Sequence, residues 1–174
     1  MSEPDRVRLA RTSDVDDVAR VQVRAWRTAY GGILPAEILG SLDESDIALE
    51  WGRALLQPGR SRLLVALTED RVVGAAAIGP STDPDAVEAG EIDLLVVDPE
   101  EWRRGHGSRL LAACVDLLVE MGFREALTWM PLSDEPRRAF LQSAGWGPDS
   151  AFRDLEVGEG RTVREVRLVT VIAD

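Results

Sequence analysis

The chain of 174 residues contains no lysine, so all 20 of its basic side chains are arginines. It has one histidine (His106), one cysteine (Cys114) and one tyrosine (Tyr30). The missing lysine excludes a Walker-type phosphate loop and Schiff-base catalysis, because both depend on a lysine amine. A single cysteine cannot form an intrachain disulfide, and one histidine with one cysteine cannot build a zinc cluster. Chemistry on this chain must therefore use carboxylates, hydroxyls, arginines and backbone dipoles.

Long apolar runs are absent as well. The longest, residues 63–67, is far too short to span a bilayer, and residues 1–8 are polar, unlike a secretion signal. The formal net charge of −11 disfavours nucleic acid and anionic membranes as partners. It suits a cationic or amine-bearing small substrate, although an acidic balance that merely aids solubility explains it equally well. We expect a cytoplasmic protein with a single domain over residues 1–174.

Hydrophobic periodicity predicts a mixed α+β or α/β domain. Segments with apolar residues at helical spacing are interspersed with short apolar or alternating runs that are typical of strands, and glycines or prolines separate them. The expected helices are residues 14–30, 35–56 (broken near 42–45), 108–121 and 134–144. The expected strands are residues 7–11, 63–67, 72–78, 92–97, 125–130, about 151–157 and 163–172.

The stretch of residues 103–108 lies between a predicted strand and a predicted helix and carries the clearest chemical signal. Gly105 and Gly107 let the backbone approach a ligand closely and turn several N–H groups toward one point. The start of the helix favours an anion, and three arginines in or next to the stretch add positive charge. These features predict a phosphate-binding loop, with a purely structural tight turn as the alternative. A dinucleotide fingerprint fails, because Leu110 stands where a third glycine is required.

Together with other segments, this loop resembles the GNAT superfamily of acyl-CoA-dependent N-acetyltransferases. In that family a Val-x-Pro step ends a strand and a Gly-x-Gly/Ala loop holds the pyrophosphate of coenzyme A; here these are Val97-Asp98-Pro99 and Gly105-His106-Gly107. A pattern in the family's first helices resembles residues 25–35 (AWRTAYGGILP), and its late Phe-Tyr…Gly-Phe/Trp signature resembles Phe140-Leu141…Gly145-Trp146. The resemblance covers nearly all of the chain.

The resemblance implies a mostly antiparallel central sheet flanked by helices, acetyl-CoA as co-substrate, and no metal. It implies direct transfer of the acetyl group to an amine of a small molecule or to an amino group of a peptide or protein. Strand backbone groups would pair with the pantetheine arm, the loop would hold the phosphates, and a residue at the start of the last helix would contact the cofactor. The cofactor-binding residues implied in this way are Leu95, Val96, Val97, Arg103, Arg104, Gly105, His106, Gly107, Ser108 and Asp134.

The catalytic groups are implied less completely. Glu91 matches a position where many family members carry an acidic residue, so it is the first candidate for the general base, directly or through water. The alternative for Glu91 is a solvated residue at the start of a strand. Asp93 lies two residues further along the same strand and is the weaker candidate. The tyrosine that commonly protonates the leaving thiolate in this family corresponds to Leu141, which leaves the acid role unassigned.

Several interpretations stay open from the sequence. His106 either packs near the phosphates or takes part in catalysis, and Tyr30 either lines the acceptor site or packs in the core. Cys114 lies on an apolar helix stripe and is expected to pack rather than to react. The leading hypothesis is an acetyl-CoA-dependent N-acetyltransferase, and the alternative is a protein of the same fold that binds or senses acyl-CoA without turnover. A homodimer formed through the late strands also remains open.

Overall fold

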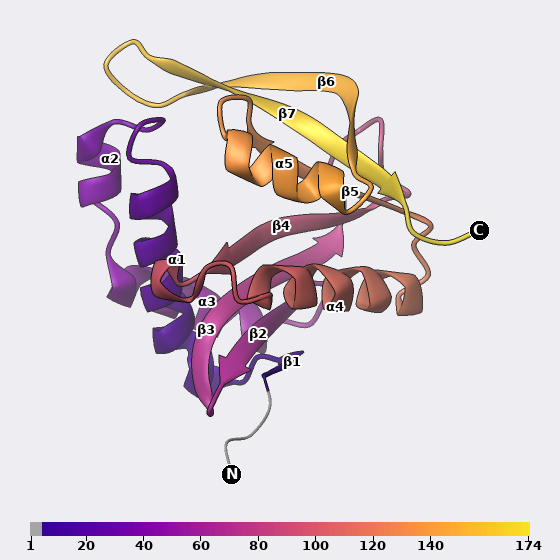
Figure 1. Cartoon of the computed structure of the whole chain (residues 1–174), viewed down its shortest axis with the longest axis horizontal. Helices are drawn as coiled ribbons and strands as arrows, with labels where there is room; N and C mark the ends of the chain where they lie inside the picture. Colours follow the sequence, from indigo (N-terminus) through magenta and orange to yellow (C-terminus); the bar gives the residue numbers. More distant parts are fainter. Residues whose placement is uncertain (1–4) are drawn as a thin grey trace.

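The strands alone show the layout of the molecule. Within residues 5–174, which the computed structural model describes, they are β1 (Arg6–Leu9), β2 (Arg62–Thr68), β3 (Arg71–Pro80), β4 (Gly90–Val97), β5 (Glu125–Pro131), β6 (Gly147–Glu156) and β7 (Thr162–Val171). They form one sheet in the order β1-β2-β3-β4-β5-β7-β6 (Figure 1). Only β4 and β5 run parallel; the other neighbours are antiparallel. Residues 1–4, the first part of the polar N-terminal stretch, lie outside the described residues.

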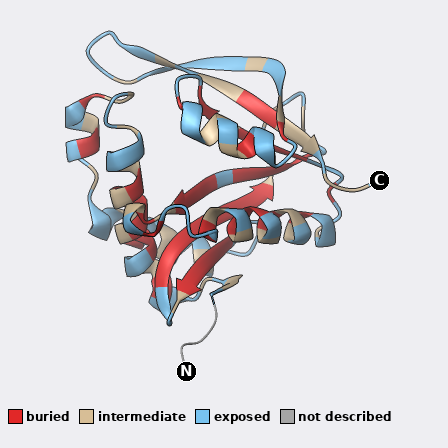
Figure 2. Ribbon diagram, viewed as in Figure 1, coloured by how far each residue is buried: buried red, intermediate tan, exposed pale blue. Residues whose placement is uncertain are grey.

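Helices cover both faces of the central strands. They are α1 (Val15–Ala29), α2 (Ala36–Gly40), α3 (Glu44–Leu56), α4 (His106–Glu120) and α5 (Glu135–Ser143). One core cluster lies between α1 and the sheet, with α3 packed alongside, and the other lies under α4. The central strands are therefore buried on both faces, whereas β6 is largely exposed (Figure 2). This confirms the predicted mixed, mostly antiparallel sheet flanked by helices.

The hairpin between β2 and β3 shows how local sequence sets the framework. Glu69 and Asp70 have φ angles of 48° and 67°, the backbone of a two-residue turn whose twist matches that of the flanking strands. On β3, an added Cβ at Gly74 would lie 2.9 Å from Leu110 Cδ1. Glycine at this position therefore lets α4 pack closely against the sheet.

The two parallel strands separate along their length. β4 pairs with β5 only at Gly90 and Glu91. Over residues 92–97 this edge of β4 faces no other strand in the described part of the chain, although its other edge pairs with β3. Backbone N–H and C=O groups along such an edge are available for other partners. The functional site forms along this unpaired edge.

A bulge bends β4 where the separation begins. Asp93 has no opposite residue on β3, because Ile92 and Leu94 pair with consecutive residues there. An added Cβ at Gly90 would point at Leu118 of α4, so the next side chain, Glu91, points to the opposite face of the sheet. The bulge thus lies two residues after Glu91, near the start of the unpaired edge.

Several element boundaries differ from prediction by two residues or more: β3 ends at residue 80 rather than 78, and β4 begins at residue 90 rather than 92. The first strand ends at Leu9 rather than at residue 11, because Arg11 begins a 3-10 turn whose Asp14 carboxylate accepts the Arg11 N–H. Helix α4 begins at His106, two residues before the predicted start at 108, because the left-handed Gly105 lets the chain enter the helix at once. The strand predicted from residue 151 begins at residue 147. Each helix among residues 5–174 is too short or too polar to cross a bilayer.

Candidate active site

A cleft of about 540 Å³ opens between α1, the end of β4 and α5, with the loop before α4 at one end. The predicted cofactor-binding residues in its wall are Leu95, Val96, Val97, Arg103, Gly105, His106, Gly107, Ser108 and Asp134. The other residues of the wall are Ala25, Trp26, Ala29, Tyr30, Glu101, Trp102, Pro136, Arg137, Ala139 and Phe140. Arg104 and Glu91 are not part of the wall. The structure therefore gathers most, but not all, of the predicted residues in one place.

The loop places backbone donors at one end of the cleft. Gly105 has a φ of 82°, a left-handed conformation that glycine adopts without strain, and it directly precedes α4. The N–H groups of residues 106–108 begin the helix and bond to no acceptor within residues 5–174. An added Cβ at Gly107 would meet Phe140 Cζ at 3.6 Å, which is an ordinary contact, so the loop has room for an alanine at this position. Free donors at a helix N-terminus make this end suited to an anion.

The unpaired edge of β4 supplies a second row of backbone groups. The carbonyl of Leu95 accepts a hydrogen bond from Arg137 Nη1 at 2.9 Å, and the carbonyl of Val97 accepts one from Trp102 Nε1 at 2.8 Å. Both residues therefore direct their backbone to the cleft, and their N–H groups share that direction. The carbonyl of Val96 instead faces β3. A ligand along this edge would find two donors, from Leu95 and Val97, and two carbonyls already bonded to side chains.

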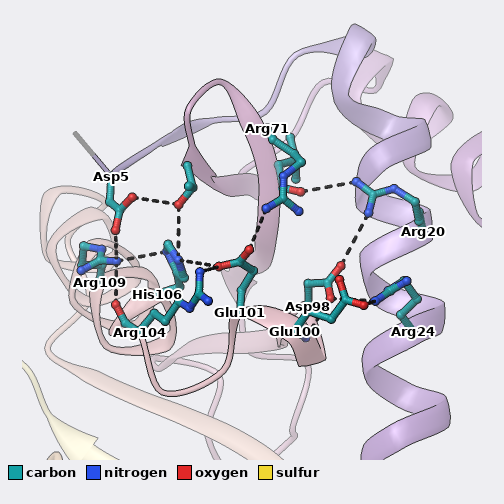
Figure 3. A network of polar contacts seen from close by, with 12 residues as sticks. Asp5, Arg20, Arg24, Arg71, Asp98, Glu100, Glu101, Arg104, His106 and Arg109 are labelled. Carbon is teal, nitrogen blue, oxygen red and sulfur yellow. Dashed lines mark hydrogen bonds and ion pairs between the residues drawn. The ribbon is translucent and has the colours of Figure 1, made fainter. Parts of the chain in front are cut away.

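Most of the charge around the loop is used within the protein (Figure 3). Glu101 is 6% exposed, and its two oxygens pair with Arg71 Nη2 at 2.6 Å and with Arg104 Nη1 at 2.9 Å. The hydrogen bond from Arg71 is the largest cause that lowers the pKa of Glu101, so this carboxylate stays ionised. Arg104 therefore supports the loop from outside the cleft. Of the two loop arginines predicted to bind the cofactor, Arg103 alone lines the cleft.

His106 lies beneath the loop and both of its nitrogens have protein partners. Nδ1 is 3.1 Å from Arg109 Nη2, and Nε2 is 3.4 Å from Thr68 Oγ1. Because the guanidinium can only donate, Nδ1 accepts and Nε2 carries the proton. Thr68 donates in turn to Asp5, whose other oxygen pairs with Arg109 at 2.8 Å (Figure 3). Burial first, then the charge of Arg109, lower the pKa of His106, so this neutral, 2% exposed imidazole packs under the loop.

Glu91 has an environment unlike that of the loop carboxylates. It is 8% exposed, and burial raises its pKa to about 7; the negative charges of Asp93 and then Asp83 act in the same direction. A carboxyl with a pKa near 7 is partly ionised at neutral pH and can accept a proton there. The alternative of a solvated residue at a strand start does not describe a side chain that is this buried.

A second cleft, of about 480 Å³, has in its wall Asp83, whose negative charge contributes to the raised pKa of Glu91. Trp129 Nε1 donates to Asp83 Oδ2 at 2.9 Å, and the Arg153 guanidinium lies 4.3 Å from the centre of a Trp129 ring. Arg167, which is 6% exposed, also bonds to Asp83 and thereby holds the 80–90 loop against β7. The wall of this cleft is formed by Asp83, Pro84, Asp85, Trp129, Ser150, Ala151, Phe152, Arg153 and Arg167.

Helix α5 carries one predicted and one unpredicted cleft residue. Asp134 caps the helix by accepting the N–H of Arg137 at 3.2 Å. The Arg137 side chain reaches back across the gap to Leu95, and its Nε is buried without a hydrogen-bond partner in the described chain. Only the spacing of three residues from Asp134 could have placed Arg137 on the cleft side of the helix. Leu141, one turn further on, is 1% exposed and belongs to the core.

The surroundings of the single cysteine and the single tyrosine decide between the roles predicted for them. Burial raises the pKa of the Cys114 thiol to about 12, and the side chain lies in the core under α4, as predicted. Tyr30 instead lines the cleft, half-buried, rather than packing in the core. No group of three or more His, Cys, Asp or Glu side chains in the described part of the chain is arranged to hold a metal ion.

Comparisons with known proteins match the chain to acetyltransferases. The family described as Acetyltransferase (GNAT) matches residues 23–146 of the chain. The N-acetyltransferase YuaI of Bacillus subtilis (strain 168), itself described as uncharacterized, is 30% identical over 165 residues, which cover 93% of this chain and 90% of that protein.

Solved structures share the fold. The PaiA N-acetyltransferase of Thermoplasma acidophilum, in complex with coenzyme A, has a TM-score of 0.74 at 16% identity and covers 97% of this chain and 99% of its own. The acetyltransferase YncA of Salmonella typhimurium, with acetyl-CoA, has a TM-score of 0.74 at 16% identity, over 99% of this chain and 96% of its own. The family resemblance, the fold and the enzyme class predicted from the sequence are thereby confirmed. The chain belongs to the acetyltransferase (GNAT) family.

Proposed function

We propose that the chain transfers the acetyl group of acetyl-CoA directly to an amine, with Glu91 as the group that accepts the proton of that amine. The observation that carries this proposal is the pairing of two features on β4. One end of the strand leads to free backbone donors suited to an anion, and the other holds a buried carboxyl whose pKa is about 7. An ammonium must lose a proton before its nitrogen can attack, and a base with this pKa accepts it near neutral pH.

Acetyl-CoA fits the first cleft by the chemistry of its walls. The pyrophosphate would lie on the N–H groups of residues 106–108, beside Arg103. The pantetheine arm would run along the unpaired edge of β4 and accept hydrogen bonds from the N–H groups of Leu95 and Val97. Asp134 would contact it from the start of α5. Arg104 would act only through its ion pair with Glu101, which holds the loop.

The reaction that follows needs no covalent bond to the protein. The amine nitrogen attacks the thioester carbonyl, a C–N bond forms, and the C–S bond breaks with its electron pair going to sulfur. Backbone N–H groups of the β4 edge stabilise the negative charge that develops on the carbonyl oxygen. The proton of the ammonium passes to Glu91, directly or through water.

The acceptor would approach from the second cleft, whose wall contains Asp83, a carboxylate whose charge acts on Glu91. The carboxylates of Asp83 and Asp93 and the overall charge of −11 favour an approaching ammonium. We therefore assign the acceptor as an amine of a small molecule or an amino group of a peptide or protein.

A competing function is binding or sensing of acyl-CoA without turnover. It is favoured by Leu141, which is buried in the core at the position where the family resemblance implies a proton-donating tyrosine. Both functions predict binding of coenzyme A in the first cleft. They differ in whether amines release free thiol from acetyl-CoA.

The experiment combines calorimetry with an acetylation assay. Coenzyme A is titrated into the protein, and acetyl-CoA is then incubated with a panel of diamines, polyamines, amino acids and short peptides while thiol release is followed. The Glu91→Gln variant, which keeps the size of the side chain, is the matched control and should bind but turn over slowly. Binding without thiol release from any amine supports the competing function. Absence of binding at low-millimolar coenzyme A overturns both.

A further inference from the structure

Cleavage of the C–S bond creates a negative charge on sulfur, and no residue has so far been assigned to protonate it. Leu141 is a hydrocarbon side chain with 1% exposure, so it can neither donate a proton nor reach the cleft. Cys114 is buried in the core, and His106 is neutral, with its one N–H directed to Thr68. The phenol of Tyr30 is the one O–H of its kind in the chain, and it lies in the cleft.

Tyr30 is held at the cleft by local structure. It caps the C-terminus of α1, where its N–H donates to the Trp26 carbonyl at 2.9 Å and its own carbonyl accepts from the Ile33 N–H. Its ring centre lies 6.2 Å from that of Trp26, which also lines the cleft. These contacts fix the backbone and the ring, whereas the hydroxyl forms no hydrogen bond with residues 5–174. The phenolic O–H is therefore available to a ligand.

Charged groups from several elements surround this hydroxyl. Burial raises the pKa of Tyr30, and the negative charges of Asp134 at the start of α5 and Glu165 on β7 act in the same direction. The guanidinium of Arg137 on α5 acts in the opposite direction. The pKa of Tyr30 nevertheless stays above its usual value, so the hydroxyl keeps its proton at neutral and mildly alkaline pH.

Arg137 lines the same cleft as Tyr30 and also contacts β4. Its Nη1 donates to the carbonyl of Leu95, on the edge where the thioester arm would lie, and its Nε–H is buried without an acceptor in the described chain. A buried N–H of this kind is unfavourable while it stays unpaired. A negative charge that develops beside Leu95 during the reaction would therefore gain a nearby cation with a free donor.

We propose that Tyr30 is the catalytic acid that protonates the departing thiolate, with Arg137 as its electrostatic partner. As the C–S bond breaks, its electron pair goes to sulfur, the phenolic proton moves to that sulfur, and the phenolate is stabilised by the guanidinium until solvent restores the proton. Tyr30 on the first helix thus takes the role left vacant by Leu141 on the last. This inference rests on the proposed acetyl transfer and identifies its missing proton donor.

The first test is the Tyr30→Phe variant, which keeps the ring and its contact with Trp26. With acetyl-CoA as donor and the amine of the panel that wild type uses fastest, kcat should fall about 10-fold to 100-fold. A thiolate is a fair leaving group, so the loss lies at the lower end of general-acid effects. The dissociation constant of acetyl-CoA from calorimetry and the thermal unfolding midpoint should stay near those of wild type. Equal kcat in both proteins overturns the assignment of Tyr30.

The second test uses the fact that Tyr30 is the only tyrosine in the chain. Growth on 3-fluorotyrosine labels this position alone, and the Tyr30→Phe protein grown in the same medium is an unlabelled control. Fluorine lowers the pKa of a phenol, and ultraviolet absorbance of the tyrosinate measures that pKa directly in each protein. The alkaline limb of the kcat profile should move to lower pH by the same amount as the measured phenol pKa. An alkaline limb that does not move overturns the proposal.

A third variant examines the partner. Arg137→Met removes the guanidinium, so the phenol pKa measured by absorbance should rise, and kcat should fall. An unchanged phenol pKa contradicts the role of Arg137. If wild type itself releases no thiol from acetyl-CoA with any amine, the proposed acetyl transfer fails and the role of Tyr30 fails with it. If wild type is active and Tyr30→Phe is equally active, only the role of Tyr30 fails.

Discussion

Two carboxyl groups near opposite ends of β4 are almost equally buried but titrate in opposite directions. Glu101, just beyond the C-terminal end, is 6% exposed and has a lowered pKa; Glu91, near the N-terminal end, is 8% exposed and has a pKa raised to about 7. Glu101 accepts hydrogen bonds from Arg71 and Arg104, whereas no arginine among the described residues pairs with Glu91. The partner of a buried carboxyl, rather than burial alone, therefore decides its protonation.

The difference separates a scaffold from a reactive group. Around the loop end of β4, carboxylates and arginines neutralise one another, and Asp98 at the end of the strand also pairs with Arg20 and Arg24 of α1 (Figure 3). These pairs hold α1, β4 and the loop together, so the backbone donors of the cleft are fixed before any ligand binds. At the other end, Glu91 keeps an unneutralised carboxyl. A carboxyl held in this way, with a pKa of about 7, can take up and release a proton near neutral pH.

The largest expected effect tests the loop end. Gly107→Glu places a carboxylate where the pyrophosphate would lie, and the affinity for coenzyme A should fall about a thousandfold, or about 4.1 kcal/mol. Calorimetry measures this loss. Gly107→Ala is the matched control, because its Cβ would meet Phe140 at 3.6 Å without a clash. Undiminished affinity of the glutamate variant would show that the anion site lies elsewhere.

The next effect tests the other end. Glu91→Gln removes the base, so kcat should fall about a hundredfold at neutral pH, while the affinity for acetyl-CoA should change little. Because Glu91 must be deprotonated to accept a proton, wild-type turnover should rise with pH through about 7. The variant should lose this acid limb. A steady-state pH profile measures it, with Glu88→Gln, an exposed neighbour in the 80–90 loop, as control. A limb that survives in Glu91→Gln belongs to another group.

The sequence predicted the strands, the loop and the helix of this region better than the partners of its charged side chains. The strands on either side of residues 69–70, the glycine loop and the apolar stripe of α4 depend on residues close together in the chain, and the structure places them as expected. The pairing of Arg104 with Glu101 also joins near neighbours, but three arginines close together suggested a ligand rather than an internal partner.

Contacts between distant segments could not be read from the sequence. The network that encloses His106 joins Asp5 and Thr68 to Arg109, residues up to 104 positions apart. The raised pKa of Glu91 depends first on its burial in the folded protein, and the charges of Asp93 and of Asp83 in the 80–90 loop add to it. The sequence therefore predicted the identity of Glu91 but not its environment.

A smaller effect concerns the free energy of unfolding, to which Glu101 and Glu91 should contribute with opposite signs. Glu101 has a lowered pKa, so its ionised form stabilises the fold above the ordinary pKa of a glutamate. This stabilisation is lost as the pH falls through the pKa of Glu101 in the folded state. Glu101→Gln should therefore lower the free energy of unfolding at pH 8 by about 1 kcal/mol. Glu91 has a raised pKa, so the folded state loses stability as pH rises from about 4.5 to about 7. Glu91→Gln should therefore raise stability at pH 8 by on the order of 2 kcal/mol.

Urea unfolding at pH 8 and at pH 5 measures both changes. At pH 5 the gain from Glu91→Gln should nearly vanish, because the wild-type carboxyl is protonated there in the folded state. Equal signs for the two variants at pH 8 would contradict the contrast between a neutralised and an unneutralised carboxyl.

The smallest effect concerns Asp93, whose charge is the second cause of the raised pKa of Glu91, after burial. Asp93→Asn should shift the acid limb of the kcat profile to lower pH by less than about one unit, which corresponds to less than about 1.4 kcal/mol. The plateau at high pH should persist, because Glu91 is then ionised in both proteins. The limb moves only if Glu91 is the titrating base and Asp93 acts on it through charge. A lost plateau would instead make Asp93 the base, and its position at the bulge would then mark it as the group nearest the acceptor.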